Sequence, residues 1–311
     1  MKQTLVIGSR GSQLALTQAR FIQGELQRLH PSLETRIEII KTSGDVNTEP
    51  LAVIGGKGVF TKELEDALFD HRIDLAVHSL KDLPTTLPAG VTIAAICKRE
   101  DPRDALVLPR GKANPSGASI SGLPGKAIVG TSSPRRLAQL KHLRNDLVFA
   151  EVRGNVDTRL RKLDEGQYAV LVLACAGLRR LGLENRISAA IPAEQMLPSP
   201  GQGALGIEIR AGDQEVADAL GELDHKFTRL ACTAERAFLR SLGGGCQLPI
   251  AAYAVVRDKK IRLDGLVADT QGEQILRDRI SGSINEAEQL GSDLAERLLA
   301  NGASELLAQE L

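Results

Sequence analysis

Short runs of β-branched and apolar residues alternate with segments of helical periodicity over most of this sequence. In the first third of the chain such runs lie at 4–7, 36–41, 73–77 and 91–96, and helical patterns lie at 14–29 and 60–69. A second series of the same kind covers 104–174. This alternation predicts an α/β architecture in which helices cover a parallel or mixed sheet.

Two breaks interrupt this pattern. The segment KREDPRD at 98–104 is charged and contains proline, and LPSPGQG at 197–203 combines proline with glycine. Both compositions are typical of a crossing between domains. Beyond the second break, strand patterns lie at 251–256, 261–268 and 273–280, before a helical tail. We therefore expect a smaller α+β unit in the C-terminal part.

Charge and composition argue against several classes of function. The 39 basic and 39 acidic side chains cancel, so no net field attracts nucleic acid or an anionic membrane. The chain has no Trp, 2 Tyr and 6 Phe, and therefore few of the flat side chains on which bases stack. Its apolar segments are shorter than a membrane span, and its N-terminus is typical of a first strand rather than a signal peptide. We expect neither a nucleic-acid partner nor membrane association.

The cysteines are far apart and form no CxxC pair. They are Cys97, Cys175, Cys232 and Cys246. This spacing argues against a metal site and a dense disulfide framework, so we expect no metal and a reducing cytoplasm. The first three are typical of small buried apolar side chains. Cys246 differs because three glycines precede it in LGGGCQLPI, and glycine permits close backbone approach.

Two predicted strand-to-helix junctions carry groups that bind anions. In VIGSRGSQLAL, Ser12 can cap the helix while Arg10 lies beside its free backbone N–H groups. In VGTSSPRR, Ser133 suits the N-cap and Pro134 suits the first helical position. The second junction also contains Thr131, Ser132, Arg135 and Arg136. Helix N-termini and arginine forks favour carboxylate or phosphate, although an ordinary helix start with solvated arginines explains the second junction equally well.

Further arginines lie where predicted strands end. Arg153 precedes Gly154 at a strand-to-helix turn, and Arg159 lies in the first turns of the following helix. Arg179 and Arg180 follow the apolar strand in VLVLACAG, at the carboxyl end where α/β sheets place ligands. In a chain of zero net charge these positions indicate a polyanionic ligand. Each arginine by itself is also compatible with chance surface placement.

Two loops near these strands carry candidate site residues. GGKGVF at 55–60 is not a phosphate loop, because Gly58 rather than Ser or Thr follows Lys57. It fits a mobile lid or, equally, a passive surface loop. In DLAVHSLKDLP, Asp82 follows a buried strand, where it is either a group facing the crevice or an ordinary turn residue. The neighbouring Lys81 favours the ionised form of Asp82.

Segments spread over nearly the whole chain together resemble the porphobilinogen deaminase family. In order, they are GSRGSQLALTQA, GGKGVFTKELE, DLAVHSLKDLP, KREDPRDA, VGTSSPRR, RGNVDTRL, LACAGLRRLGL, PGQGALGIE and LGGGCQLPI. The departures are small. Ala251 and Ala252 follow CQLPI where we would expect glycine first, and Pro134 stands where leucine also occurs in the family.

The resemblance implies two periplasmic-binding-protein-like α/β domains around a cleft and a smaller α+β domain that carries Cys246. The implied bounds are 1–97 with 200–221, 103–197 and 225–311. It also implies a dipyrromethane cofactor joined to Cys246 by a thioether. Porphobilinogen units are added to it in turn, each with loss of ammonia, and hydrolysis then releases the linear tetrapyrrole hydroxymethylbilane. Such a transferase belongs to tetrapyrrole and haem biosynthesis.

The same resemblance implies a role for each candidate residue. Asp82 matches the catalytic aspartate: loss of ammonia leaves an azafulvene, whose positive charge a fixed carboxylate stabilises while it also passes protons. Lys57 and Phe60 belong to the loop over the cleft. The expected cofactor ligands are Cys246, Lys81, Asp82, Thr131, Ser132, Ser133, Arg135, Arg136 and Arg153. The expected substrate ligands are Arg10, Ser12, Arg153, Arg159 and Arg180.

A non-catalytic polycarboxylate-binding module is the alternative, since the same pair of α/β domains serves solute receptors and sensor domains. A secreted receptor needs a signal peptide and a regulator needs a DNA-binding unit, and we see neither pattern in this sequence. We expect instead a cytoplasmic, monomeric enzyme with porphobilinogen as its small-molecule partner.

Overall fold

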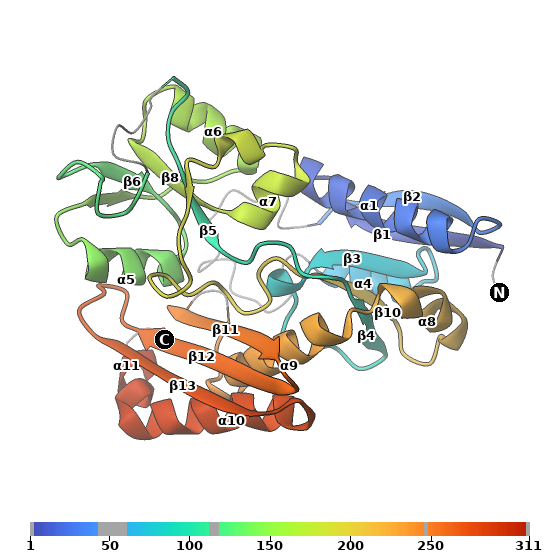
Figure 1. Ribbon diagram of the computed structural model, residues 1–311. Helices are drawn as coiled ribbons and strands as arrows, with labels where there is room; N and C mark the ends of the chain where they lie inside the picture. The colour runs from blue at the N-terminus through green and yellow to red at the C-terminus, as the bar shows by residue number, and fades with distance from the viewer. Residues whose placement is uncertain (1–2, 43–60, 112–117, 246–247, 309–311) are drawn as a thin grey trace. The chain divides into compact units, whose positions relative to one another are not determined.

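The computed structural model describes residues 3–42, 61–111, 118–245 and 248–308 (Figure 1). The chain divides into two compact units: unit 1 is Met1–Glu100 with Ala204–Arg229, and unit 2 is Asp101–Gly203 with Leu230–Leu311. Unit 1 contains a five-stranded sheet, and unit 2 contains a second five-stranded sheet and a three-stranded sheet.

The sheet of unit 1 is mixed, with the strand order β2-β1-β3-β10-β4. Its strands are β1 (Thr4–Arg10), β2 (Glu34–Ile40), β3 (Leu75–Ser79), β4 (Val91–Ile96) and β10 (Leu205–Arg210). β1 pairs in parallel with β2 and β3, whereas β10 lies antiparallel between β3 and β4. A strand from late in the chain thus completes a sheet that the N-terminal residues begin.

Helices cover both faces of this sheet. They are α1 (Gln13–Leu29), α4 (Lys62–Phe69) and α8 (Gln214–Leu220), with 3-10 turns η1 (Leu80–Asp82) and η3 (Gly221–Leu223). On one face, Ile7, Ile22 and Ile207 belong to the core that β1 and β10 share with α1 and α8. On the other face, α4 packs through Leu64 and Leu68. Because both faces are covered, side chains on both sides of the strands are buried.

The five-stranded sheet of unit 2 has the order β7-β6-β8-β5-β9. Its strands are β5 (Asp104–Val107), β6 (Ile128–Gly130), β7 (Val148–Ala150), β8 (Val170–Ala174) and β9 (Ala189–Ala190). Around it lie α5 (Pro134–Leu143), α6 (Val156–Asp164), α7 (Cys175–Arg180) and the 3-10 turn η2 (Glu184–Arg186). α5 packs on one face through Leu140, whereas α6 and α7 pack on the other through Leu163 and Leu178. β7, β6 and β8 run parallel, so their carboxyl ends share one edge.

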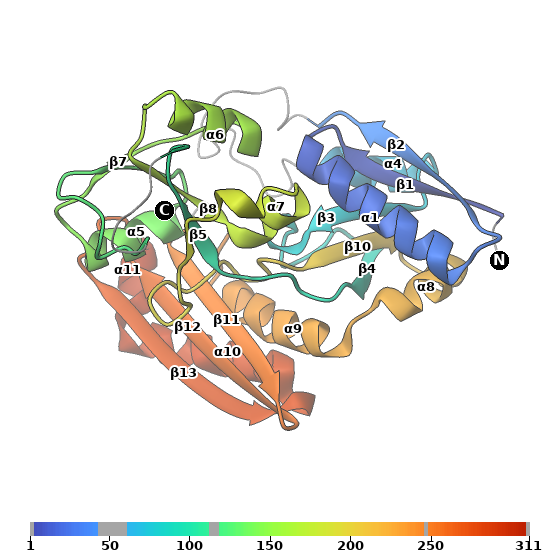
Figure 2. The same cartoon turned by 45° about the horizontal axis from the view of Figure 1, so that its top comes forward.

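The three-stranded sheet of unit 2 is an antiparallel meander. Its strands, β11 (Ile250–Arg257), β12 (Lys260–Ala268) and β13 (Ile275–Ser283), pair in that order. The nearby helices are α9 (Lys226–Ser241), α10 (Ala287–Leu298) and α11 (Ser304–Ala308), with the 3-10 turn η4 (Ile284–Glu286) and the π-helical segment η5 (Leu299–Ala303). Figure 2 shows α10 along one face of this sheet, where Phe238, Leu263 and Leu294 belong to a common core.

The opposite face of the three-stranded sheet packs on α5. Ala138 of α5 forms a buried cluster with Ala251 and Leu266. The turn between β12 and β13 also approaches α5 closely: Gly272 has a φ of 71°, and a Cβ there would lie 2.4 Å from the Ala138 carbonyl oxygen. Only glycine tolerates both conditions. The contact fixes the three-stranded sheet against the helix that carries Arg135 and Arg136.

The predicted α/β class is confirmed, because helices cover two five-stranded sheets and a smaller sheet with its own helices follows. The sequence pattern does not predict β9 and α7, which span two and six residues and are too short for a periodic signal.

The division into three domains stays a prediction. Cys246, Lys57 and Phe60 lie outside the described residues. Within the described ranges, no helix has both the length and the apolar character that a membrane crossing requires.

Candidate active site

In unit 1, a hollow of about 60 Å³ lies beside the neighbouring parallel strands β1 and β3. The predicted residues Arg10, Ser12 and Asp82 all line it. Its other lining residues are Leu14, Ala15, Gln18, Thr61, Val77, His78 and Ser79. These residues gather where β1 and β3 end, and the carboxyl end of parallel strands is where α/β sheets bind ligands. The structure therefore brings together three residues that the sequence singled out separately.

Asp82 is held at the hollow by an apolar anchor on each side. Leu80 and Leu83 are 0% and 4% exposed, and the Leu80 amide donates to the Ala204 carbonyl oxygen at 3.0 Å. With these neighbours buried, the short turn η1 leaves Asp82 exposed. Lys81 lies beside it in the same turn and is half-buried. The position of the carboxylate is thus set by the core of unit 1.

The start of α1 supplies two further polar groups to the hollow. Ser12 is the N-cap, as predicted, and its Oγ accepts a hydrogen bond from the Ala15 amide at 3.3 Å. Gln18, which the sequence pattern did not single out, is 3% exposed and donates through Nε2 to Ser79 Oγ at 2.9 Å. It lies in the buried stripe of α1 with Ala19. A polar residue within an apolar helical stripe is the signal that could have identified it.

In unit 2, residues 131–133 connect the end of β6 to the start of α5. Ser132 Oγ donates to the Val152 carbonyl oxygen at 2.7 Å and accepts from the Val152 amide at 3.0 Å. Thr131 Oγ1 accepts from the Ser133 amide at 3.2 Å. Ser133 and Pro134 occupy the N-cap and the first helical turn, as predicted, but the Ser133 side chain forms no cap hydrogen bond. Its hydroxyl therefore does not satisfy the amides of the first turn of α5.

Arg135 and Arg136 are buried rather than solvated. They are 5% and 7% exposed, and both bind Asp104, which is 0% exposed. Arg135 Nη1 lies 2.7 Å from Asp104 Oδ2, and Arg136 Nη2 lies 2.7 Å from Oδ1. Burial alone would raise the pKa of Asp104, but the two guanidinium groups outweigh it and hold the pKa well below its ordinary value. The alternative of an ordinary helix start with solvated arginines is therefore wrong.

Arg153 and Arg159 lie on either side of the start of α6. Between them Gly154 has a φ of 108°, which favours glycine. Asn155 is the N-cap, and its Oδ1 accepts from the Thr158 amide at 2.9 Å. Arg159 donates through Nε to the Gly154 carbonyl oxygen at 2.8 Å. The turn thus fixes the position of Arg159 relative to the end of β7.

Arg159 carries the clearest sign of an anionic ligand in unit 2. Burial and the neighbouring charge of Arg136 lower its pKa. Among the residues that the structure describes, no carboxylate lies within ion-pair distance of it. A desolvated cation beside a second cation is stabilised by an anion. Arg153, by comparison, binds the exposed Glu151 at 2.6 Å, and Arg180 donates to the Gly203 carbonyl oxygen at 2.6 Å.

The strand order places these groups along one edge of the sheet. β7, β6 and β8 are parallel neighbours. Arg153 follows β7, residues 131–133 follow β6, and α7 with Arg180 follows β8. The hydrogen bonds between Ser132 and Val152 join the first two segments. The structure thus brings most of the predicted unit 2 ligands to one edge, while Arg135 and Arg136 bind inward to Asp104.

Two family models match the sequence. Residues 5–218 match the model described as "Porphobilinogen deaminase, dipyromethane cofactor binding domain", and residues 229–300 match "Porphobilinogen deaminase, C-terminal domain". A porphobilinogen deaminase of Synechococcus elongatus is 50% identical over 303 residues, which cover 97% of this chain and 93% of that protein. One of Gloeobacter violaceus is 51% identical over 312 residues, which cover 99% and 94%. The chain belongs to the porphobilinogen deaminase family.

Solved structures that resemble this chain are more distant. The BenM effector binding domain with its effector benzoate is 18% identical, with a TM-score of 0.43 over 72% of this chain and 90% of that domain. A probable amino-acid ABC transporter extracellular-binding protein, ytmK from Bacillus subtilis, is 13% identical, with a TM-score of 0.40 over 72% and 90%. Membership of an enzyme family does not favour the alternative of a non-catalytic binding module.

The donors of unit 2 fit the carboxylates of the dipyrromethane that the porphobilinogen deaminase family binds. Arg159 has no carboxylate partner among the described residues. The start of α5 offers backbone amides that Ser133 leaves uncapped. Cys246, the predicted covalent anchor, lies outside the described residues.

The other described cysteines of the chain lie in its core. Cys97, Cys175 and Cys232 are buried and form no disulfide, which confirms the prediction that they are small buried side chains. Burial raises the pKa of Cys175 to about 12, so its thiol is not a nucleophile at neutral pH. Over the described part of the chain, His, Cys, Asp and Glu form no group suited to a metal ion.

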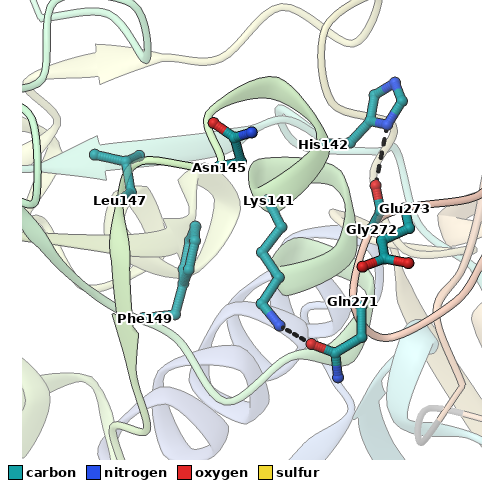
Figure 3. A pocket seen from close by; sticks show the side chains of 8 residues that line it. All are labelled: Lys141, His142, Asn145, Leu147, Phe149, Gln271, Gly272 and Glu273. Carbon is teal, nitrogen blue, oxygen red and sulfur yellow. Dashed lines mark hydrogen bonds between the residues drawn. The ribbon is translucent and has the colours of Figure 1, made fainter.

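A larger hollow of about 410 Å³ lies at the C-terminal end of α5 (Figure 3). Its lining residues are Lys141, His142, Asn145, Leu147, Phe149, Gln271, Gly272 and Glu273, and it contains none of the predicted site residues. Lys141 Nζ donates to Gln271 Oε1 at 2.8 Å, and His142 Nδ1 lies 3.1 Å from the Gly272 carbonyl oxygen. These polar groups hold the β12–β13 turn against α5.

Proposed function

We propose that this chain is the transferase that joins porphobilinogen molecules head to tail, with loss of ammonia, to give hydroxymethylbilane on a covalently bound dipyrromethane primer. Membership of the porphobilinogen deaminase family over nearly the whole chain carries this proposal. The hollow of unit 1 supports it, because Asp82 and Arg10 line one small space. Porphobilinogen has acetate and propionate arms, so it needs cations at its carboxylates and a separate anion at its reacting ring.

Asp82 stabilises the positive charge that develops on the reacting pyrrole. Loss of ammonia spreads this charge over the ring, and a carboxylate that is already in place offsets it without reorganisation. The carboxylate can also take up and return a proton during the bond changes. Because Leu80 and Leu83 are buried, the turn that holds Asp82 is anchored before the substrate arrives.

The start of α5 and its neighbours bind the cofactor. When bound, dipyrromethane supplies the pyrrole carbon to which the first porphobilinogen is joined. Thr131, Ser132 and Ser133 bind its carboxylates through hydroxyl groups and backbone amides, and Arg153 and Lys81 add positive charge. Cys246 holds the cofactor through a thioether. The resemblance to the family also assigns Arg135 and Arg136 to this set.

Substrate carboxylates bind to Arg10, Ser12, Arg153, Arg159 and Arg180. The support is strongest for Arg159, whose charge has no carboxylate partner among the described residues. The resemblance to the family also assigns Lys57 and Phe60, which lie outside the described residues, to the active site. We assign the chain three domains, with the bounds 1–97 with 200–221, 103–197 and 225–311, and a monomeric, cytoplasmic state. The wide spacing of the cysteines along the chain, with no CxxC pair, supports a reducing compartment.

The test is conversion of porphobilinogen by the purified protein, with ammonia and tetrapyrrole followed together. We expect ammonia to appear in step with porphobilinogen consumption and a linear tetrapyrrole to be the first product. Intact mass measurement should show an adduct of two deaminated porphobilinogen units that is absent from Cys246→Ala. Protein that carries the adduct but leaves porphobilinogen unchanged would refute the reaction. Active protein without the adduct would refute the anchor.

A further inference from the structure

A cluster of ionisable side chains is buried directly behind the Asp82 hollow. His78 of β3 and Glu208 of β10 are in contact, with Nε2 3.1 Å from Oε2. Their side chains are 4% and 0% exposed. Glu65 of α4 is 6% exposed and lies near both, so the charges of His78 and Glu208 affect its pKa. Carboxylates are rarely buried so completely unless they are paired.

The sheet of unit 1 places these groups on one face. Val77 of β3 and Ile207 of β10 belong to the core beneath α1 and α8. Since successive residues of a strand face opposite sides, His78 and Glu208 face the side that α4 covers. Glu65 is among the buried residues of α4. The cluster is therefore a product of the fold and not of a flexible surface.

Two carboxylate oxygens of the cluster lack a hydrogen-bond partner among the residues that the structure describes. They are Glu65 Oε1 and Glu208 Oε1. A buried unpaired oxygen keeps its full cost of desolvation, and two ionised carboxylates in one buried site repel each other. A proton on one carboxyl removes the repulsion and provides a hydrogen-bond donor. Because the described residues gather no metal-binding group, a proton is the occupant that fits.

The charges around Glu65 favour that proton. Burial raises the pKa of Glu65 and the Thr61 hydroxyl lowers it, while the carboxylate of Glu208 raises it and the imidazole of His78 lowers it. Of these effects burial is the largest. The protonated form of Glu65 is therefore favoured over a wider pH range than that of an exposed glutamate.

His78 connects the cluster to the hollow. His78 is among the residues that line the hollow, together with Thr61 and Asp82. A space of about 60 Å³ is large enough to hold water. His78 is therefore the member of the cluster that belongs both to the buried carboxylate contact and to the hollow.

We propose that Glu65, Glu208 and His78 form a proton store behind Asp82, with His78 as the residue that exchanges protons with the hollow. The inference rests on the proposed function and adds positioning residues to it. When one porphobilinogen is joined to the next, its protonated amine leaves as ammonia, and the pyrrole carbon that gains the new carbon–carbon bond loses a proton. The ammonia takes up one proton as ammonium, so the count balances. The store holds that proton between the two events.

Charged groups from four elements of unit 1 lie in or next to the cluster and the hollow. They are Glu208 on β10, Glu65 with Asp66 on α4, Arg10 at the end of β1, and Asp82 with the neighbouring Lys81 on η1. β4, the other neighbour of β10, has the sequence VTIAAI and contributes no ionisable group. Each of these charges can therefore be removed by a single substitution.

The test compares Glu65→Gln, Glu208→Gln and His78→Gln with the wild type in kcat, KM and pH dependence. We expect kcat to fall roughly tenfold, less than for loss of a group that touches the substrate. KM should change by less than about twofold, because substrate binding is not altered. The pH profile of kcat should shift in each variant. Infrared spectroscopy of the wild type at neutral pH should show the carbonyl band of a protonated carboxyl group, which disappears in Glu65→Gln.

Glu235→Gln is the matched control for these variants. Glu235 is also 0% exposed, but its two carboxylate oxygens accept from the amides of Gly201 and Ala254, each at 2.7 Å. Its replacement should lower stability and leave the pH profile and the infrared band unchanged.

If His78→Gln fails to fold, Glu65→Gln still tests whether the proton store exists. A folded Glu65→Gln protein that keeps either the infrared band or the wild-type pH profile overturns the proton store. Wild-type protein that leaves porphobilinogen unchanged refutes the proposed function instead, and the infrared band then still tests the store.

Discussion

The strand-to-helix junctions of unit 1 and unit 2 resemble each other in sequence, but their polar groups are satisfied in different ways. Ser12 caps α1 with its side chain, whereas Ser133 forms no such bond to α5. At both junctions an arginine and a serine lie at the start of a helix, and that similarity made both candidates for anion binding. The structure shows that only the second leaves its helix N-terminus uncapped by its own serine.

The buried charges behind the two junctions differ more strongly. In unit 2, Asp104 is bound by two guanidinium groups and by Gln202 Nε2 at 3.0 Å. In unit 1, Glu65 and Glu208 each keep an oxygen without a hydrogen-bond partner among the described residues. A fully bonded network fixes geometry, whereas a partly bonded one can change its protonation. Unit 2 is thus suited to hold a ligand in place, and unit 1 is suited to move protons.

Removal of the charge on Asp104 should have the largest effect. Asp104→Asn leaves two buried guanidinium groups without their carboxylate, so the free energy of unfolding should fall by about 3–5 kcal/mol. Because the pKa of Asp104 is lowered in the folded state, its stabilisation is present above the ordinary aspartate pKa of about 3.9 and is lost as the pH falls below it. The difference between variant and wild type, measured by urea unfolding, should therefore shrink in acid.

Asp146→Asn is the control for this comparison. Asp146 binds Arg144 at 2.6 Å with its side chain exposed to solvent, so water screens the pair. Its replacement should change stability far less than Asp104→Asn. Equal effects of the two substitutions would contradict the view that unit 2 is held by its buried network.

The second expected effect falls on catalysis in unit 1. Asp82→Asn removes the charge that stabilises the reacting ring, so kcat with porphobilinogen should fall roughly a hundredfold to a thousandfold. Asp82 is exposed, so thermal unfolding should be close to that of the wild type. Turnover near the wild-type rate would remove Asp82 from the mechanism and leave the hollow as a binding feature only.

Sequence periodicity locates strands, but it does not show whether both faces of a strand are covered. In LGIEIR, the alternation of Leu205, Ile207 and Ile209 with polar residues is typical of a strand that has one face in solvent. Glu208 is instead 0% exposed, because α4 covers the second face of the sheet. The local pattern contains no information about a helix that arrives from another part of the chain.

The same lack of long-range information in the local sequence explains why the binding partner of the unit 2 arginines was not predicted. The sequence identified Arg135 and Arg136 and the helix start that carries them. Their partner Asp104 lies in β5, a separate strand of the sheet, within a segment that reads as a charged domain crossing. Local capping rules predict bonds within a few residues, as at Ser12, whereas an ion pair across a sheet depends on strand order. The sequence therefore located the charges but not what neutralises them.

The two helix caps offer a smaller and sharper test of the comparison. Ser12→Ala removes the hydrogen bond to the Ala15 amide and should lower the free energy of unfolding by about 1 kcal/mol. Ser133→Ala removes no cap bond and should change stability by less than about 0.5 kcal/mol. Urea unfolding of both variants measures the difference. A larger loss for Ser133→Ala would show that its hydroxyl serves the fold rather than a ligand.

The smallest expected effect concerns the buried carboxyl of Glu65. The pKa of Glu65 is raised in the folded state. The stability that its protonated form contributes is therefore fully present below the ordinary glutamate pKa of about 4.3. This stability is lost as the pH rises through the raised pKa. Glu65→Gln stays neutral at every pH, so it should gain stability relative to the wild type as the pH rises. Urea unfolding between acid and neutral pH measures this trend. Asp66 is exposed on the same helix, so Asp66→Asn controls for the loss of a charge on α4. A constant difference between Glu65→Gln and the wild type would mean that Glu65 binds no extra proton in the folded protein. The contrast between a proton-exchanging unit 1 and a fixed unit 2 would then lose its basis.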